Sequence, residues 1–154
     1  MKIIKRLLIL LFLLLFTGCS NSKVKVNSQK EIVSTNDDMV IEIKEKMFIA
    51  QLDDVFTNPN DYIGRTIKIE GFYDPLEMDG RTINYVSRRS PGCCGNDGIA
   101  CIEFIGDKKM PKRNDWIEVI GKIEEYEDES GKSVRIRLGT LNVKTERGAE
   151  FVSQ

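Results

Sequence analysis

The stretch TIKIEGF, at residues 66–72, alternates polar and apolar side chains. A period of two is typical of a half-buried antiparallel strand, because successive side chains point to opposite faces of a sheet. The dipeptide Asp79-Gly80 favours the tight turn that joins two antiparallel strands. A second strand-like stretch, TINYVS at residues 82–87, follows this turn. These residues predict a β-hairpin, from which the rest of the fold can be extended.

Three further strands are predicted downstream of this hairpin, at residues 99–105, 115–126 and 134–143. Gly121 predicts a bulge or sharp bend in the fourth strand, and Gly139 interrupts the fifth. Five strands with short turns and two glycine bends predict a mostly β fold, a small five-stranded OB-like Greek-key barrel. The alternative from the same pattern is an open antiparallel sheet packed on a helix.

One short helix is predicted before the strands. Phe48, Leu52, Val55 and Phe56 recur at the spacing that places apolar side chains on one helix face. Pro59 ends this helix, because the residue before a proline is pushed out of the α region. A short strand is also predicted within residues 39–45.

The N-terminus has the pattern of an export signal. A basic start, MKIIKR, precedes an apolar run of ten residues from Leu7 to Phe16. Such a run spans about 15 Å as a helix, half of the roughly 30 Å of a bilayer core. This layout is typical of a secretory signal peptide. The sequence FTGC at residues 16–19 resembles the lipobox of bacterial lipoproteins, which implies diacylglycerol on the Cys19 thiol and cleavage after Gly18.

The chain therefore divides into three predicted parts. Residues 1–18 are a lipoprotein signal peptide, residues 19–38 are the lipidated cysteine with a flexible polar tether, and residues 39–154 are a single OB-like β domain. The tether is rich in Ser, Asn, Lys and Gln and has no aromatic residue, so it buries too little apolar area to fold alone. We expect the protein at the cell membrane, lipid-anchored and facing outside the cytoplasm.

Composition excludes several functions. The 154 residues include 23 basic and 24 acidic side chains and no histidine. Without histidine the chain has no Ser-His-Asp triad, Cys-His pair or HExxH zinc site. Removing residues 1–18 takes away three basic and no acidic side chains, so the mature chain is acidic. An acidic exported domain is a poor match for the phosphate backbone, and no nucleic-acid partner is expected.

Three cysteines gather at residues 90–101, which are predicted to form a glycine-rich loop between the second and third strands. With Cys19 acylated, Cys93, Cys94 and Cys101 are an odd number of thiols outside the cytoplasm, so they cannot all pair within one chain. One interpretation is a disulfide from Cys93 or Cys94 to Cys101. A second is a zinc or Cu(I) site on the three thiols, with Asp97 or Glu103 as an oxygen ligand. Thiol redox chemistry and small buried hydrophobes with no special role are the others.

Two weaker features remain. Phe72, Tyr73 and Tyr85 are candidates for the binding face of an OB-like barrel, although core packing explains Phe72 better. The basic segment 108–113 lies between the third and fourth strands and is interpreted as a solubilising loop, with contact to anionic lipid or a partner as the alternative.

Residues 47–144 resemble the C-terminal domain of the DUF1980, or YcgQ-like, family of bacterial membrane proteins. The similarity is carried by NPNDYIG at 58–64 leading into 67–72, by CCGND at 93–97, and by NDWIEVIGKI at 114–123. The resemblance implies an OB-like domain that works beside a membrane permease, with a lipid anchor here in place of the family's membrane helices. We therefore expect a non-enzymatic binding or accessory module and no catalytic residues. The alternatives are a thiol-redox or thiol-dependent enzyme using the same cysteines, or a purely structural domain stapled by a disulfide.

Overall fold

The computed structural model describes residues 39–93, 95–129 and 131–153. The first elements are β1 (Ile41–Glu42), the 3-10 helix η3 (Glu45–Met47), α2 (Phe48–Thr57) and the 3-10 helix η4 (Pro59–Asp61). Five longer strands follow: β2 (Thr66–Met78), β3 (Arg81–Gly92), β4 (Gly95–Ile105), β5 (Trp116–Asp128) and β6 (Gly131–Val143). The predicted helix and all five predicted strands are present.

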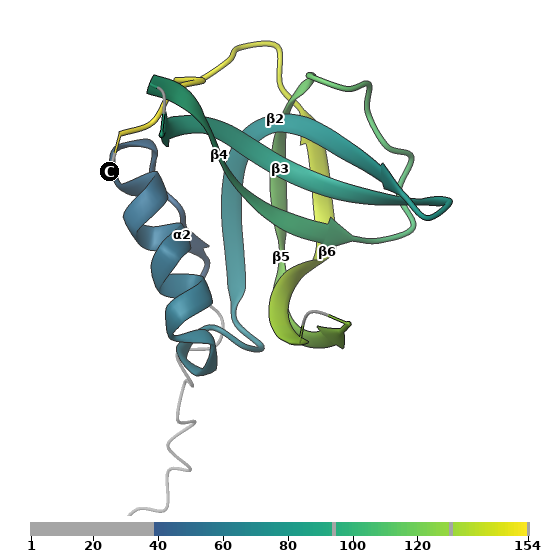
Figure 1. The fold of residues 1–154 in the computed structure, drawn as a ribbon. Coiled ribbons are helices and arrows are strands. Elements are labelled where there is room, and N and C mark those ends of the chain that lie inside the picture. Colours follow the sequence, from purple (N-terminus) through teal and green to yellow (C-terminus); the bar gives the residue numbers. More distant parts are fainter. Residues whose placement is uncertain (1–38, 94, 130, 154) are drawn as a thin grey trace, which may run out of the picture. The chain divides into compact units, whose positions relative to one another are not determined.

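The five long strands close into a barrel (Figure 1). Antiparallel neighbours are β2 with β3, β3 with β4, and β5 with β6, while β4 meets β6 in parallel at Phe104 and Ile136. Pairing of β2 with β5 completes the circle, so β2 has a neighbour on each side. The predicted five-stranded OB-like barrel is confirmed, and the open sheet is wrong, because the β2–β5 ladder leaves no gap between the first and last strands.

The core lies inside the barrel and under the helix. Alternate residues of β2 and β4 point inward, and α2 adds Phe48, Leu52 and Val55, each at most 4% exposed. The strands contribute β-branched and aromatic side chains, among them Ile67, Ile69, Val86, Ile102, Phe104 and Ile136. The helix thus covers apolar side chains that the barrel would otherwise leave in water.

Two glycines allow close approach of neighbouring strands. A Cβ at Gly121 would lie 2.2 Å from the backbone oxygen of Arg137, and a Cβ at Gly71 would lie 2.4 Å from that of Ser87. The β5–β6 register shifts between Ile120 and Gly121, as predicted for a bulge, and Gly139 is the extra residue on β6. The barrel bends at these points because no side chain separates the two backbones.

The prediction of a loop at residues 90–101 is wrong, because most of these residues belong to β3 and β4. Residues of β3 and β4 remain paired to Gly92 and Gly95, with Ser90 opposite Gly98 and a register irregularity between Ser90 and Gly92. Glycine can adopt extended backbone angles as well as those of a turn, so the glycines here do not interrupt the pairing of β3 with β4. The turn is therefore confined to the tip of a long hairpin.

The C-terminal segment after β6 runs over one end of the barrel towards η3 and α2 (Figure 1). The backbone N–H of Arg89 donates to the Glu150 carbonyl at 2.9 Å, and the N–H of Val152 donates to the Arg89 carbonyl at 2.9 Å. Val152 is buried in the core. The segment therefore extends the sheet beside the part of β3 that β2 does not reach.

The predicted signal peptide (1–18), Cys19 and the tether (19–38) lie outside the described residues. Of the helices in residues 39–93, 95–129 and 131–153, none is long and apolar enough to cross a bilayer.

Candidate functional site

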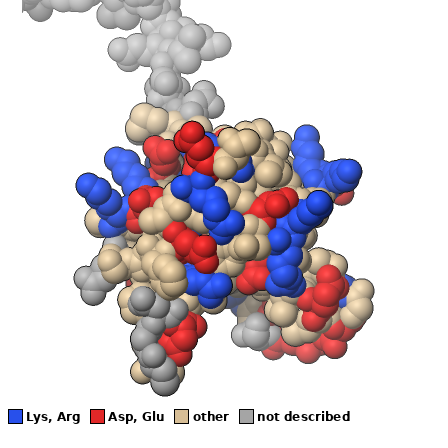
Figure 2. Space-filling model, turned by 90° about the horizontal axis from the view of Figure 1, so that it is seen from above, with Lys and Arg blue, Asp and Glu red and all other residues tan. Residues whose placement is uncertain are grey.

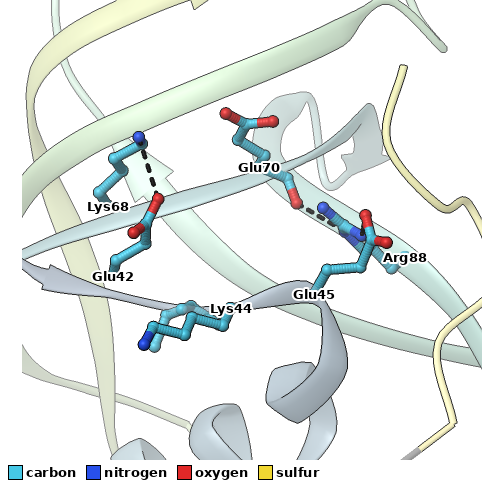
Figure 3. A pocket seen from close by; sticks show the side chains of 7 residues that line it. Glu42, Lys44, Glu45, Lys68, Glu70 and Arg88 are labelled. Atoms are coloured by element: carbon cyan, nitrogen blue, oxygen red, sulfur yellow. Dashed lines mark hydrogen bonds and ion pairs between the residues drawn. The ribbon is translucent and has the colours of Figure 1, made fainter.

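A buried arginine joins four parts of the domain at one end of the barrel. Arg88 on β3 is 3% exposed, and its Nε donates to the Glu70 carbonyl on β2 at 2.8 Å. Its Nη1 donates to Glu45 Oε2 at 3.1 Å and to the Ala149 carbonyl at 2.8 Å. Figure 3 shows Glu45 and the Glu70 carbonyl on the same guanidinium. The planar donor array of arginine suits several acceptors at once.

Two aromatic rings cover this guanidinium. Its carbon lies 5.0 Å from the centre of the Phe48 ring and 4.9 Å from that of Trp116. The Ala149 backbone N–H and the Arg88 guanidinium together lower the pKa of Glu45, so its carboxylate stays charged beside Arg88. The Arg88 guanidinium has a hydrogen-bond acceptor on each of three segments, whereas the buried Trp116 Nε1 has no partner among the described residues. We interpret this cluster as structural.

A shallow charged hollow lies beside Arg88 and holds about 250 Å³. Lys68 Nζ lies 3.1 Å from Glu42 Oε1 in this hollow (Figure 3). The same Nζ lies 3.4 Å from Glu118 Oε2 on β5. These two carboxylates, Glu42 first, raise the pKa of Lys68. The acidic and basic side chains that line the hollow are equal in number. Their charges therefore cancel, and the hollow has little net electrostatic attraction for a charged ligand.

A larger and more apolar pocket lies on the outer face of β2, β3 and β4. It holds about 450 Å³. Cross-strand pairing brings its residues together, because Asp74 lies opposite Tyr85 and Ser87 lies opposite Cys101. The lining consists of Asp74, Pro75, Leu76, Tyr85, Ser87, Ile99, Cys101 and Arg113. Pockets of this size are typical of small-ligand sites.

Ser87 forms the floor of this outer-face pocket. It alternates with Val86, which points into the core, so Ser87 faces outward on the same side as Tyr85. The residue is fully buried, and its Oγ has no hydrogen-bond partner among the residues that the structure describes. An unpaired hydroxyl in a buried place is unusual, since most such groups in proteins are satisfied.

Cys101 lies beside Ser87 in the same pocket. Burial raises the pKa of its thiol, and the nearby Asp74 carboxylate raises it further. The thiolate is the nucleophilic form, so a thiol held protonated at neutral pH is a poor nucleophile. Burial also raises the pKa of Tyr85, with Glu103 as the next cause, so its phenol is neutral as well.

An ion pair closes one side of the pocket. Arg113, in the segment between β4 and β5, bonds to the Asp74 carboxylate and to the Pro75 carbonyl on β2. The Arg113 side chain is 59% exposed, so it forms the rim. A smaller neighbouring hollow of about 250 Å³ shares Asp74, Ile99 and Arg113, and the two hollows flank this ion pair.

The predicted aromatic candidates divide between the two sides of the barrel. Tyr73 packs in the core and donates its hydroxyl to Asn84 Oδ1 at 2.6 Å. Phe72 is 6% exposed but lies outside the core cluster, beneath the Arg89 guanidinium at 5.8 Å. Only Tyr85 lines the outer-face pocket. Phe72 is thus buried by packing, as expected, but on the side of β2 opposite Tyr73 and apart from the main core cluster.

The predicted cysteine site is spread along the β3–β4 hairpin. Cys93 lies in the exposed tip, with Sγ 3.9 Å from Asp97 Oδ2, and Cys94 lies outside the described residues. Cys101 is six strand residues beyond Gly95, or about 20 Å at 3.3 Å per residue. A disulfide needs Cα atoms within about 7 Å, so this hairpin does not bring Cys93 to Cys101.

The described residues likewise do not form a metal site around the cysteines. Within residues 39–93, 95–129 and 131–153, no three Cys, Asp or Glu side chains come together as metal ligands would. Glu103, the other suggested oxygen ligand, forms an ion pair with Arg135 at 3.6 Å. Zinc or copper at Cys93, Cys94 and Asp97 stays a prediction that depends on Cys94.

Sequence reasoning did not single out Asp74, Leu76 or Ser87, which line the outer-face pocket. The sequence pattern marks Arg113 only as part of the basic segment 108–113. Cys101 was singled out for its thiol, but its position in an apolar pocket was not expected. The available signal was the alternation of β4, which puts Ile99, Cys101 and Glu103 on one face.

The strands define a small OB-like barrel with a pocket on the outer face of β2, β3 and β4. The profile of the DUF1980 C-terminal domain matches residues 19–150. The chain therefore belongs to the DUF1980 C-terminal domain family, as its sequence resemblance predicted. No curated protein and no solved structure matches the chain.

Proposed function

We propose that this protein is a lipid-anchored, extracytoplasmic binding module that acts without catalysis and holds a ligand on the outer face of β2, β3 and β4. The observation that carries the proposal is the pocket of about 450 Å³ on that face, with the buried Ser87 hydroxyl at its floor. A site whose walls are mostly apolar, with one ion pair at its rim, is suited to binding.

The anchor in this proposal is diacylglycerol on Cys19. Two acyl chains hold a protein stably on a membrane, because each buried CH₂ contributes about 0.8 kcal/mol. The layout predicted from the sequence supports this, with a signal peptide at 1–18, a tether to residue 38 and the barrel domain at 39–154. A flexible tether of that length has a mean reach of roughly 25 Å. The barrel would thus stay close to membrane proteins, and a permease is the partner that the family resemblance implies.

Two observations favour binding over the alternatives. The raised pKa of Cys101 argues against a thiol-dependent enzyme at this pocket. Figure 2 shows Lys and Arg interspersed with Asp and Glu on the face in view, which does not favour binding of a nucleic-acid backbone.

The anchor is tested by fractionating cells that express the wild-type chain, Cys19→Ser or the matched control Cys93→Ser. We expect the wild type and Cys93→Ser in the membrane fraction, digestible by protease added outside the cytoplasmic membrane. Cys19→Ser should be released or should accumulate with its signal peptide. Equal membrane retention and processing of all three proteins would contradict the lipid anchor.

The binding face is tested by placing a photo-crosslinking amino acid at Ile99, which lines the pocket, or at Lys122 on β5 as a control. Both positions are exposed. We expect crosslinks to a membrane protein from Ile99 and few from Lys122. Equal crosslinking from both positions would mean that the outer face of β2–β4 is not the binding face.

A further inference from the structure

We propose that the outer-face pocket takes an uncharged, mainly apolar small molecule, which inserts one hydrogen-bonding group against the Ser87 hydroxyl. This inference rests on the proposed function for the location of the site, and it adds the class of ligand and the residue that selects it.

The first argument is the unpaired hydroxyl of Ser87. Its backbone belongs to the β2–β3–β4 ladder, so only the side chain lacks a partner among the described residues. A buried hydroxyl without a partner costs free energy that an alanine at the same place would avoid. A ligand with one donor or acceptor at its buried end would form a hydrogen bond with the hydroxyl and so offset that cost.

The second argument is the absence of net charge around the floor. Asp74 and Arg113 neutralise each other at the rim, and the Cys101 thiol and the Tyr85 phenol are both neutral. A charged group pushed to the floor would lose its hydration and find no counter-ion among these residues. The inserted end of the ligand is therefore uncharged.

The third argument is the character of the walls. Pro75, Leu76 and Ile99 line the pocket with aliphatic surface, and Tyr85 adds an aromatic ring. Leu76 is 48% exposed and Ile99 is 45% exposed, so apolar side chains stand in water when the pocket is empty. An apolar ligand body would remove this surface from water, which is favourable in proportion to the area covered.

In this proposal the ligand reaches the floor by displacing side chains. The hydroxyl is covered in this structure, but Leu76, Ile99 and Arg113 at the rim are exposed side chains. Exposed side chains change rotamer rapidly, within nanoseconds. A ligand therefore reaches Ser87 without opening the β2–β3–β4 ladder.

The test compares p-cresol with toluene, two probes of nearly the same shape that differ by one hydroxyl. The full-length protein is held in phospholipid nanodiscs, and free probe is set by dialysis so that partition into lipid does not matter. The readout is the alkylation rate of Cys101 by iodoacetamide, measured by peptide mass spectrometry. Cys93 at the exposed hairpin tip is the internal reference, because it lies outside the pocket.

We expect p-cresol to slow alkylation of Cys101 at least fivefold without changing Cys93, with an affinity about tenfold above that of toluene. Ser87→Ala should bind both probes equally. The control Ser90→Ala, a mostly buried serine that does not line the pocket, should keep the preference. Equal affinity of the two probes in the wild type, or a preserved preference in Ser87→Ala, would overturn the proposal, as would no protection of Cys101.

This outcome separates the two proposals. If neither probe protects Cys101 while Ile99 still crosslinks to a membrane protein, the ligand class is wrong and the binding module stands. If the crosslink at Ile99 is lost as well, both proposals fail.

Discussion

The guanidinium carbon of Arg88 lies 4.9 Å from the centre of the Trp116 ring, and the two residues come from strands that are not neighbours in the sheet. Arg88 is on β3 and Trp116 begins β5, with β2 between them. The same guanidinium meets the C-terminal segment at Ala149 and the helical side of the domain at Glu45. One buried cation therefore fastens the tail and the helix to the barrel.

We predict that Arg88→Met destabilises the protein by about 2–4 kcal/mol, because the Glu70 and Ala149 carbonyls lose this donor and the Glu45 carboxylate loses its counter-ion. Arg88→Lys keeps the charge but not the planar array of donors, so we expect a loss of about 1–3 kcal/mol. The free energy of unfolding in urea measures both. Arg65→Lys, which removes one long bond to the Asp61 carbonyl, should change stability by less than about 0.5 kcal/mol. If Arg88→Met had the same free energy of unfolding as the wild type, Arg88 would not stabilise the fold as proposed.

We predict that Glu45 contributes to acid sensitivity. The Ala149 N–H and Arg88 lower its folded pKa below the ordinary value of 4.5. A carboxyl with a depressed folded pKa stabilises the protein above its unfolded pKa, and this contribution is lost as pH falls through the folded pKa. Glu45→Gln should therefore lose less stability than the wild type between about pH 5 and pH 3.

The measurement is the free energy of unfolding at pH 7, 5, 4 and 3. The control is Glu146→Gln, an exposed position on the same C-terminal segment, and it should follow the wild type at each pH. If Glu45→Gln and the wild type lose the same stability over this window, then Glu45 is not held charged by its partners.

The barrel was predictable because its signals are local. Alternation at residues 66–72, the turn at Asp79-Gly80 and the glycine at 121 each act within one or two strands. Closure of the barrel followed from the number of strands and the need to cover their edges. The helix was equally clear from its apolar spacing, and Phe48, Leu52 and Val55 are buried as predicted, while Phe56 is 43% exposed.

The pocket was not predictable because it depends on register. Ser87 meets Cys101 only because the hairpin turns at residues 92–95, whereas glycines at 92, 95 and 98 suggested a longer loop. Arg113 reaches Asp74 across 39 residues of chain, and no local pattern marks such a contact. The lone hydroxyl of Ser87 is a property of its surroundings, which sequence alone does not describe.

We predict that Gly71→Ala destabilises the protein by about 3 kcal/mol, because its Cβ would lie 2.4 Å from the backbone oxygen of Ser87 and the two strands would have to separate. Gly80→Ala is the control. Gly80 has a φ of +74° and open space around it, so alanine should cost only about 1 kcal/mol there. Thermal unfolding ranks the two variants, and an equal loss would show that the close approach at Gly71 is not limiting.

We predict that zinc binding, where it occurs, is independent of Cys101. The strand geometry places Cys101 about 20 Å from the hairpin tip, too far to share an ion with Cys93. Native mass spectrometry after zinc addition should give the same stoichiometry for the wild type and Cys101→Ser. Loss of zinc in Cys101→Ser, with retention in the control Ser90→Ala, would show that the hairpin folds differently.

The last prediction concerns the two described thiols directly. Cys93 is exposed, while Cys101 is half-buried with a raised pKa, so we expect iodoacetamide at pH 8 to modify Cys93 at least ten times faster. Because only the thiolate reacts, Cys101 should accelerate as pH rises above 9, and unfolding in urea should make the two rates equal. Digestion without reductant should yield no peptide that links Cys93 to Cys101, since the hairpin keeps their backbones apart. A linked peptide, or equal rates in the native protein, would mean that residues 90–101 form the compact loop expected from their glycines and not a paired hairpin.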